Sequence, residues 1–468
     1  MKTMRILFFF CLSILVASFA GGCISDDFTD SPSDVLYFST DTLRFDTVFT
    51  DLGTPTARLK VFNKASKAIN ISSISFRNDD GIFSMNVDGV SGKSFQNVEI
   101  RANDSIFIFV ECYIDANGDS SPFKVEGKID FVTNGVNQSV TLEAYGQNVR
   151  RLRNFTVEEN MTLTDEMPYV IFDTLRVASG ATLTIAPGAN ILFHDGGILQ
   201  VDGCLQAVGT PDKKINLRGD RLDNVLPDTG YEILAGQWKG VRFSPGSFLN
   251  RMEYVEMQST VEGIVVDSCG VTDRSKLELV NSWIHNSQGN VLRSSHANVS
   301  AYGCCFSDAG YAVVSLTGGV HDFVQCTLAN YYLFAISPET ILTLSHVSRE
   351  QSSGIANPLM KANFDNCIIY GITSPITPGD LKGTDIYLRN VLLGVKGTDD
   401  DHFISCIWNE DPMFETIRDK YIFDYQLKED SPVIHAGNPE LVTPICLIDM
   451  NGVNRLALGD PALGAYAH

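Results

Sequence analysis

Asn281-Ser282-Trp283-Ile284-His285-Asn286 is the first of five similar segments in the second half of the chain, and their spacing decides the fold. The other four are Gly303–Asp308, Gln325–Asn330, Asn366–Gly371 and Asn390–Leu393. The fourth residue of each segment is large and apolar, and these residues are Ile284, Phe306, Leu328, Ile369 and Leu393. They lie 22, 22, 41 and 24 residues apart, and the gap of 41 fits either one coil with an excursion or two coils of uneven length. A period near 22 indicates a solenoid whose coils each contain a few short strands.

Coils of this length predict a right-handed parallel β-helix. Residues two apart in a strand face the same way, so the second position of each segment should point inward beside the fourth. The second positions are Ser282, Cys304, Cys326, Cys367 and Val391. They form a ladder of small residues beside a ladder of large ones, and we therefore interpret these cysteines as packed core residues. We expect the amides that precede them to hydrogen-bond along the helix axis; these are Asn281, Gln325, Asn366 and Asn390.

Residues 35–150 have a different pattern, in which short alternating strands such as Ser105–Val110 recur about every ten residues between polar turns. This pattern predicts an all-β sandwich. The successive segments that also resemble Hydin-like immunoglobulin-type domains are Leu43–Val48, Val61–Lys64 and Ile69–Ile71. That resemblance implies an interaction or spacer module next to the N-terminus.

Residues 151–410 contain the predicted β-helix. Leu183–Gly188, Ile191–Phe193 and Trp238–Phe243 resemble rungs of pectate-lyase-like β-helix proteins. The resemblance concerns architecture and implies no particular activity, because sites rather than scaffolds carry function.

Residues 411–468 contain a third pattern. Asp411–Phe414, Ser431–Gly437, Asp449–Arg455 and Asp460–Tyr466 occur in an order that resembles the choice-of-anchor segment at the end of many secreted bacterial β-helix proteins. We interpret this segment as a cap, because open solenoid ends recruit other chains. The predicted fold class is therefore all-β: a sandwich, then a parallel β-helix with a C-terminal cap.

The first 22 residues form a signal peptide, with Lys2 and Arg5 before the apolar run Ile6–Ala20. The sequence Ala20-Gly21-Gly22-Cys23 resembles the lipobox of bacterial lipoproteins, which implies that Cys23 is acylated. Residues 23–34 form an acidic linker that resembles the export signal of surface lipoproteins in the Bacteroidetes. We therefore expect a lipid-anchored protein of the outer membrane, on the cell surface or facing the periplasm.

The chain has 468 residues, with 35 basic against 56 acidic side chains and a formal net charge of −21. This charge argues against nucleic acid as a partner, because phosphate binding needs a basic surface. The partners that we expect are the membrane, through the lipid on Cys23, and a polysaccharide or protein ligand. Insertions at 217–237 and 334–360 are where we expect specificity to be built, because loops on a rigid scaffold carry function.

The strongest catalytic candidates are His285, Asp308 and Arg293, which should point outward from neighbouring coils. Trp283-Ile284-His285-Asn286 only partly matches the Trp-Ile-Asp-His rung of pectate lyases, since it lacks the aspartate. The Gly-His-Gly and Arg-Ile-Lys tripeptides of polygalacturonase-like proteins are absent from the sequence. We therefore expect no lyase or hydrolase turnover that depends on these three residues.

Asp399, Asp400 and Asp401 form the densest acidic cluster of the sequence. Carboxylate oxygens suit calcium, so these residues are the candidate metal ligands. A solvated loop is the alternative, and no other cofactor is indicated by the sequence.

Three functions remain open at this stage. The first is a non-catalytic, surface-anchored protein that presents the β-helix for binding or adhesion. The second is a β-helix polysaccharide lyase or glycosidase, and the third is a structural envelope protein. An enzyme should show converging carboxylates in a groove, whereas a binding protein should show an aromatic strip.

Overall fold

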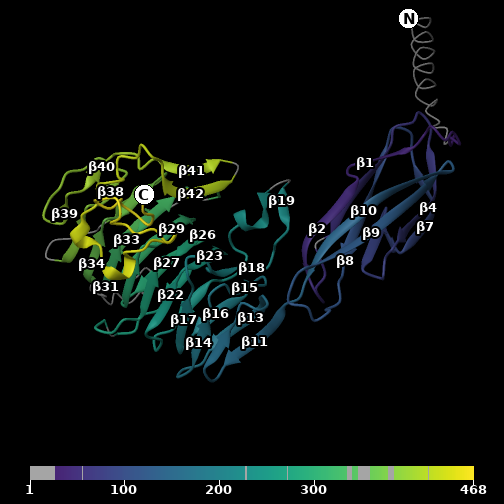
Figure 1. Ribbon diagram of the computed structural model, residues 1–468. Coiled ribbons are helices and arrows are strands. Elements are labelled where there is room, and N and C mark those ends of the chain that lie inside the picture. Colours follow the sequence, from purple (N-terminus) through teal and green to yellow (C-terminus); the bar gives the residue numbers. More distant parts are fainter. Residues whose placement is uncertain are drawn as a thin grey trace, which may run out of the picture. The chain divides into compact units, whose positions relative to one another are not determined.

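The computed structural model describes residues 27–54, 56–226, 229–270, 272–334, 340–345, 359–377, 384–419 and 421–468. Cys23 and the signal segment lie outside these residues. The described chain is almost entirely β, with three short 3-10 helices and no α-helix (Figure 1). None of the described helices is long and apolar enough to cross a membrane. The chain divides into two compact units, Met1–Gln147 and Asn148–His468.

The first unit contains two five-stranded sheets. One has the order β1 (Leu36–Phe38), β3 (Ala57–Asn63), β8 (Ser105–Cys112), β5 (Phe83–Val87) and β6 (Val90–Gly92). The other has the order β2 (Thr42–Phe49), β10 (Val136–Gln147), β9 (Phe123–Thr133), β4 (Ile69–Arg77) and β7 (Ser94–Ile100). Only β2 and β10 pair in parallel; the other pairings are antiparallel.

Strict alternation along these strands explains how the first unit acquires its core. In β8 the side chains of Ile108, Val110 and Cys112 are buried, and the residues between them are exposed. The buried residues of both sheets form one hydrophobic cluster, to which β9 contributes Ile129 and Phe131. Period-two patterning of this kind buries one face of each sheet and leaves the other face in solvent.

The second unit consists of long parallel sheets, which is consistent with the predicted β-helix. After β11 (Arg150–Val157) and β13 (Tyr169–Val177), the coils from β15 to β37 each contribute one strand to each of three faces. Face A contains β15 (Asn190–Phe193), β18 (Ile215–Gly219), β23 (Val255–Thr260), β26 (Trp283–Ser287), β29 (Cys305–Ala309), β32 (Thr327–Asn330), β35 (Ile368–Gly371), β38 (Leu392–Leu393) and β40 (Ile407–Trp408).

Faces B and C complete each coil. Face B contains β16 (Ile198–Val201), β21 (Val241–Phe243), β24 (Ile264–Val266), β27 (Leu292–Ser295), β30 (Val314–Thr317), β33 (Leu342–Ser345) and β36 (Ile376–Thr377). Face C contains β12 (Met161–Leu163), β14 (Thr182–Ile185), β17 (Cys204–Val208), β22 (Asn250–Glu253), β25 (Leu277–Val280), β28 (Asn298–Tyr302), β31 (Gly319–Val324), β34 (Leu359–Asp365), β37 (Asp385–Arg389) and β39 (Phe403–Ile404).

The strand register on face A is the one that the repeat predicted. Ile284 pairs with Phe306, which pairs with Leu328, then Ile369 and Leu393. Because Leu328 lies directly against Ile369, the gap of 41 residues is one coil with an excursion. The side chains of Cys304, Cys326 and Cys367 are fully buried in the main core cluster, as expected.

The amides that precede face A include one pair that hydrogen-bonds along the helix axis, as predicted, and they also make other contacts. Asn281, Gln325, Asn366 and Asn390 all have positive φ, between 43° and 56°, which asparagine tolerates better than most residues. Gln325 accepts a hydrogen bond from Asn366 at 3.1 Å, in the amide orientation that its surroundings require. Asn281 Nδ2 donates to the Tyr254 hydroxyl of the preceding coil at 3.0 Å and to the carbonyl of Ile448, in the C-terminal segment, at 2.8 Å.

The C-terminal segment lies against the outer side of face A, which corrects the prediction of an end cap. Its elements are β41 (Phe414–Asp419), β42 (Ile422–Leu427), η2 (Pro439–Leu441) and η3 (Pro444–Cys446). Phe414, Tyr425 and Leu463 form one apolar cluster with Cys305 and Ile368, which point outward from face A. The outward residues of several rungs are themselves apolar, so it is the side of the solenoid that needs covering.

Candidate functional site

A pocket of about 320 Å³ opens on face A, between an insertion, the four strands β18, β23, β26 and β29, and the C-terminal hairpin. The insertion follows β18 and contains β19 (Asn224–Leu226), β20 (Thr229–Gly230) and η1 (Tyr231–Ile233). The polar side chains that line the pocket are those of Arg218, Glu232, Glu256, Gln258, His285, Asn286 and Asp308. Its aromatic lining comes from Trp283, Tyr332, Phe334, Tyr421 and Phe423. At this size the pocket is at the small end of the range for ligand sites.

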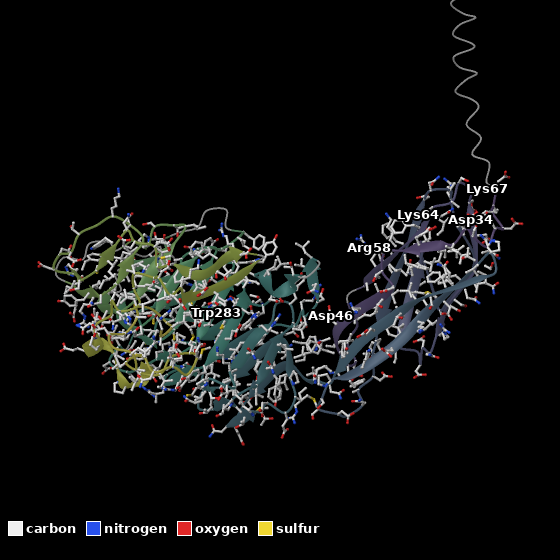
Figure 2. All side chains as sticks on the ribbon, turned by 45° about the horizontal axis from the view of Figure 1, so that its top comes forward. Asp34, Asp46, Arg58, Lys64, Lys67 and Trp283 are labelled. Atoms are coloured by element: carbon white, nitrogen blue, oxygen red, sulfur yellow. The ribbon has the colours of Figure 1, made fainter. Side chains whose placement is uncertain are left out.

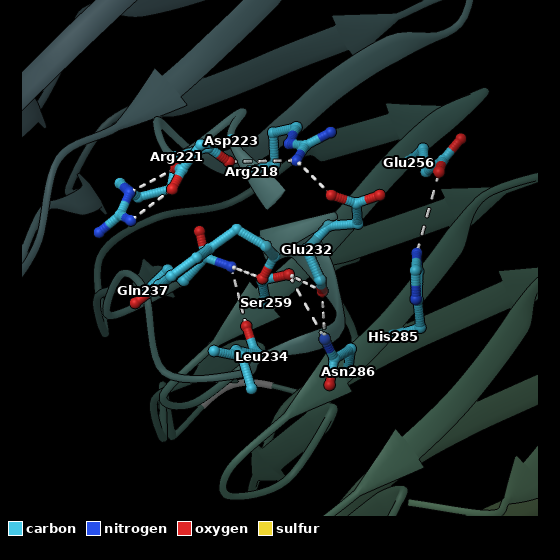
Figure 3. Close-up of polar contacts among 11 residues, drawn as sticks. Arg218, Arg221, Asp223, Glu232, Leu234, Gln237, Glu256, Ser259, His285 and Asn286 are labelled. Carbon is cyan, nitrogen blue, oxygen red and sulfur yellow. Dashed lines mark hydrogen bonds and ion pairs between the residues drawn. The ribbon is translucent and has the colours of Figure 1, made fainter. Parts of the chain in front are cut away.

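Several hydrogen bonds fix the insertion to the coils, among them two that one backbone carbonyl accepts. The carbonyl of Glu232 accepts a hydrogen bond from Asn286 Nδ2 at 2.7 Å and another from Ser259 Oγ at 2.8 Å (Figure 3). At the end of the insertion, the side-chain amide of Gln237 donates a hydrogen bond to the carbonyl of Leu234 at 2.8 Å. These bonds bring the carboxylate of Glu232 within 3.4 Å of the Arg218 guanidinium.

One wall of the pocket is built from β23 and β26. The rings of Trp283 and His285 stack, with centroids 3.9 Å apart and planes 15° from parallel. Strand alternation causes this, because the two residues are two positions apart on one strand. Glu256 pairs in register with Trp283, and its Oε1 lies 3.9 Å from His285 Nε2. The imidazole lowers the pKa of Glu256 although burial raises it, so this carboxylate is ionised at neutral pH.

Two nitrogens at the pocket are buried without a hydrogen-bond partner among the described residues. They are Nε of Arg218 and Nε2 of His285, whose 3.9 Å separation from Glu256 is too long for a hydrogen bond. Buried polar atoms are normally paired, and an unpaired one costs free energy. A ligand acceptor would satisfy Arg218 Nε, and a ligand acceptor or donor, according to the tautomer, would satisfy His285 Nε2.

Asp308 lies at the base of the pocket and is held by the C-terminal hairpin. Its carboxylate accepts a hydrogen bond from the Tyr425 hydroxyl at 2.7 Å and another from the backbone N–H of Tyr331 at 3.1 Å. Its side chain is almost completely buried, and burial raises the pKa of Asp308. The position of Asp308 therefore serves the attachment of β42 to face A.

The structure brings together two of the three predicted catalytic residues. His285 and Asp308 both line the pocket. Arg293 lies on β27 of face B and is not part of the pocket lining. Arg218 and Glu232 belong to the insertion 217–237, where the sequence predicted specificity, whereas Glu256 was not among the predicted residues. The spacing of the rungs contained a signal for Glu256. Met257 precedes Ile284 by 27 residues and Glu256 precedes Trp283 by the same number, so Glu256 pairs with Trp283 on the neighbouring strand.

The acidic cluster shows no ligand geometry. Asp399 Oδ1 accepts hydrogen bonds from the backbone N–H of Cys406 and from Trp408 Nε1, at 3.2 and 3.0 Å. Asp400 Oδ1 accepts from the backbone N–H groups of His402 and Phe403, which lowers the pKa of Asp400. Across the described part of the chain, no three His, Cys, Asp or Glu side chains are grouped as metal ligands, with Asp401 and its neighbours included.

Comparison with known proteins gives little further information. No family model matches the chain. Protein bark beetle of Drosophila melanogaster is 38% identical over 81 residues, which is 17% of this chain and 2% of that protein. The chain thus spans a small fraction of the length of this curated relative.

Similarity to solved structures is equally limited. A family 123 glycoside hydrolase from Clostridium perfringens has a TM-score of 0.18 and 12% identity, covering 26% of each chain. A protein of unknown function from Porphyromonas gingivalis W83 has a TM-score of 0.18 and 11% identity, covering 28% of this chain and 58% of that one. Scores this low support no argument about fold or function.

Proposed function

We propose that this chain is a lipid-anchored envelope protein, displayed at the cell surface, that binds a neutral sugar residue in the pocket on face A. The observation that carries the proposal is that two buried nitrogens, Arg218 Nε and His285 Nε2, lack a hydrogen bond beside the ionised Glu256. A sugar hydroxyl can both accept and donate a hydrogen bond. One hydroxyl group, or two adjacent ones, would therefore provide hydrogen-bond partners for the two nitrogens and for the Glu256 carboxylate.

The rest of the pocket supports the same ligand class. Apolar faces of a sugar ring pack against aromatic side chains, and Trp283, Tyr332 and Phe334 supply these. The volume of about 320 Å³ suits a single sugar unit rather than a long chain. Three carboxylates line the pocket against one arginine, so a uronic acid would meet repulsion.

The proposal assigns roles to the lipid anchor, the first unit, the coils and the C-terminal segment on the basis of the sequence. Cys23 carries the lipid, and the first unit is an immunoglobulin-type sandwich that acts as a stalk. The coils wind right-handed, because nearly all parallel crossovers do so. The choice-of-anchor-like segment covers the side of the solenoid.

A glycosidase or lyase is the second candidate. It is favoured by one observation, that Glu232 and Glu256 line the same pocket, since glycoside hydrolysis uses two carboxylates. A purely structural envelope role is the third, and it requires no ligand at all.

A glycan array tests the first proposal. The chain without its signal peptide is compared with Trp283→Ala and Glu256→Gln variants, after thermal melting shows that both fold. Glu415→Gln, an exposed carboxylate on β41 that is not part of the pocket lining, is the matched control. We expect neutral glycans to bind the parent and the control and to be lost from the two pocket variants. Equal binding by all four proteins would reject the pocket as the site.

A further inference from the structure

The outer side of the sheet β1-β3-β8-β5-β6 in the first unit carries aromatic rings and cations side by side. We call it the aromatic–cation face. The cross-strand pairs that place these side chains together are Tyr37–Phe62, Lys60–Phe107 and Arg58–Phe109. Residues directly opposite each other in antiparallel strands project on the same side of a sheet. Their buried neighbours, such as Leu59 and Ile108, point into the core instead.

The rings on this face are unusually open to solvent for side chains of their size. Tyr37 is 47% exposed, Phe107 37% and Phe109 39%. The rings of Phe107 and Phe109 stack on each other, with centroids 6.2 Å apart. Single exposed apolar residues are ordinary, whereas neighbouring exposed rings mark an interaction surface.

The cations of this face contact rings rather than carboxylates. Lys64 Nζ lies 4.1 Å from the centroid of the Tyr37 ring. Lys60 Nζ lies 5.0 Å from that of Phe62 and 5.3 Å from that of Phe107, and Arg58 lies 5.2 Å from Phe107. Within the described residues none of the three cations has an ion pair.

Some other cations of the same unit are paired with carboxylates instead. Arg77 pairs with Asp130 at 3.0 Å, and Lys93 pairs with Asp79 at 3.2 Å. The acid at the edge of the face, Glu111, already accepts a hydrogen bond from Thr56 Oγ1 at 3.0 Å. The positive charge of the aromatic–cation face is therefore available to a partner, although the chain as a whole is acidic.

The face continues toward the place where the chain enters the first unit. Figure 2 shows Arg58, Lys64 and Lys67 following one another along one side of this unit. Phe28 forms a parallel bridge with Ala68, next to Lys67, and Thr29 N–H donates to the carbonyl of Ala68 at 3.0 Å. Phe28 is five positions after Cys23, which corresponds to a reach of at most about 18 Å.

We propose that the aromatic–cation face docks on the phosphate headgroups of an anionic lipid surface. Arginine and lysine attract such headgroups, and aromatic side chains are enriched at the membrane–water interface. Screening confines the attraction to this face, because charges more than about 8 Å away contribute little at physiological salt. A lipid on Cys23 would hold the face beside the bilayer, so this inference adds to the proposed anchor, yet the binding itself requires no lipid on the protein.

Vesicle co-sedimentation tests the proposal with the mature chain carrying Cys23→Ser, so that no acyl group contributes. Vesicles of phosphatidylcholine alone are compared with vesicles that also contain phosphatidylglycerol, at low and at high salt. We expect sedimentation with the anionic vesicles only, and release at high salt. The double change Arg58→Glu with Lys60→Glu should lower the partition coefficient at least about tenfold.

The matched control is Arg44→Glu with Lys128→Glu, which makes the same charge change on the other sheet of the same unit. It should alter the partition coefficient less than twofold. An equal loss in both doubles, binding to phosphatidylcholine alone, or binding to soluble heparin without binding to vesicles would overturn the proposal. None of these outcomes bears on sugar binding, because the glycan array uses no membrane.

Discussion

Tyr425 on β42 donates its hydroxyl hydrogen bond to Asp308 on β29, with its Oη 2.7 Å from Oδ1 and 2.9 Å from Oδ2 of that carboxylate. Both side chains are buried, and 117 residues separate them in the chain. The contact fixes the C-terminal hairpin on the coils and thereby places Tyr421 and Phe423 at the pocket.

Replacing Tyr425 with Phe should therefore destabilise the second unit. The buried carboxylate of Asp308 loses its hydroxyl partner, which costs about 1–3 kcal/mol. Denaturant unfolding measures the change, and Tyr311→Phe, at a tyrosine that is 52% exposed, is the control. A variant as stable as the parent would show that the hairpin is held by other contacts.

His321 on β31 should make the protein sensitive to acid. Its side chain is fully buried, and burial lowers the pKa of His321 from 6.5 to about 4. Because the folded-state pKa is depressed, this histidine contributes stability above pH 6.5 that is lost as the pH falls toward about 4. The loss amounts to about 3 kcal/mol. The free energy of unfolding should fall less steeply over this range in His321→Gln, and parallel curves would contradict the argument.

The cysteine ladder should be unreactive in the folded protein. Burial raises the pKa of the Cys304 and Cys326 thiols, and Cys367 is equally inaccessible. A thiol reagent should label the partly exposed Cys204 first and these three only after unfolding. Cys326→Asp should cost about 3–5 kcal/mol, because the buried charge has no partner, while Cys326→Ala should cost about 1 kcal/mol. Rapid native labelling of all three cysteines would be inconsistent with the register.

No lyase or hydrolase turnover should depend on His285, Asp308 or Arg293. The mature chain is incubated with pectins, alginate and glycosaminoglycans in the presence of calcium, and unsaturated products and reducing ends are followed. We expect no product, because the pocket carboxylates repel uronates. Turnover that disappears in His285→Ala or Glu256→Gln, but survives in Glu415→Gln, would instead favour the glycosidase or lyase.

The anchor prediction rests on the sequence alone, since Cys23 lies outside the described residues. Full-length protein carrying Cys23→Ser should move from the detergent phase to the aqueous phase, because acyl chains dominate the membrane affinity. Cys11→Ser, within the predicted signal peptide, is the control. A Cys23→Ser protein that still partitions into detergent would exclude lipidation at this residue.

The sequence by itself determined the coil period and the inward positions of each rung. Ile284, Phe306 and Leu328 stack as their spacing predicted, and so do the three buried cysteines. A solenoid makes this predictable, because each coil contacts only its neighbours and a local repeat contains all the information needed.

The tertiary structure alone decided what covers the outer side of the rungs. A repeat pattern shows that Trp283, His285 and Asp308 are near one another, yet it cannot show that Glu232 arrives from an insertion or Tyr425 from the C-terminal hairpin. It also led to the wrong location for the C-terminal segment, which packs along face A. These contacts join the coils to segments that do not share the repeat. The surface that such a segment recognises, with its shape and its buried polar groups, exists only once the coils have assembled.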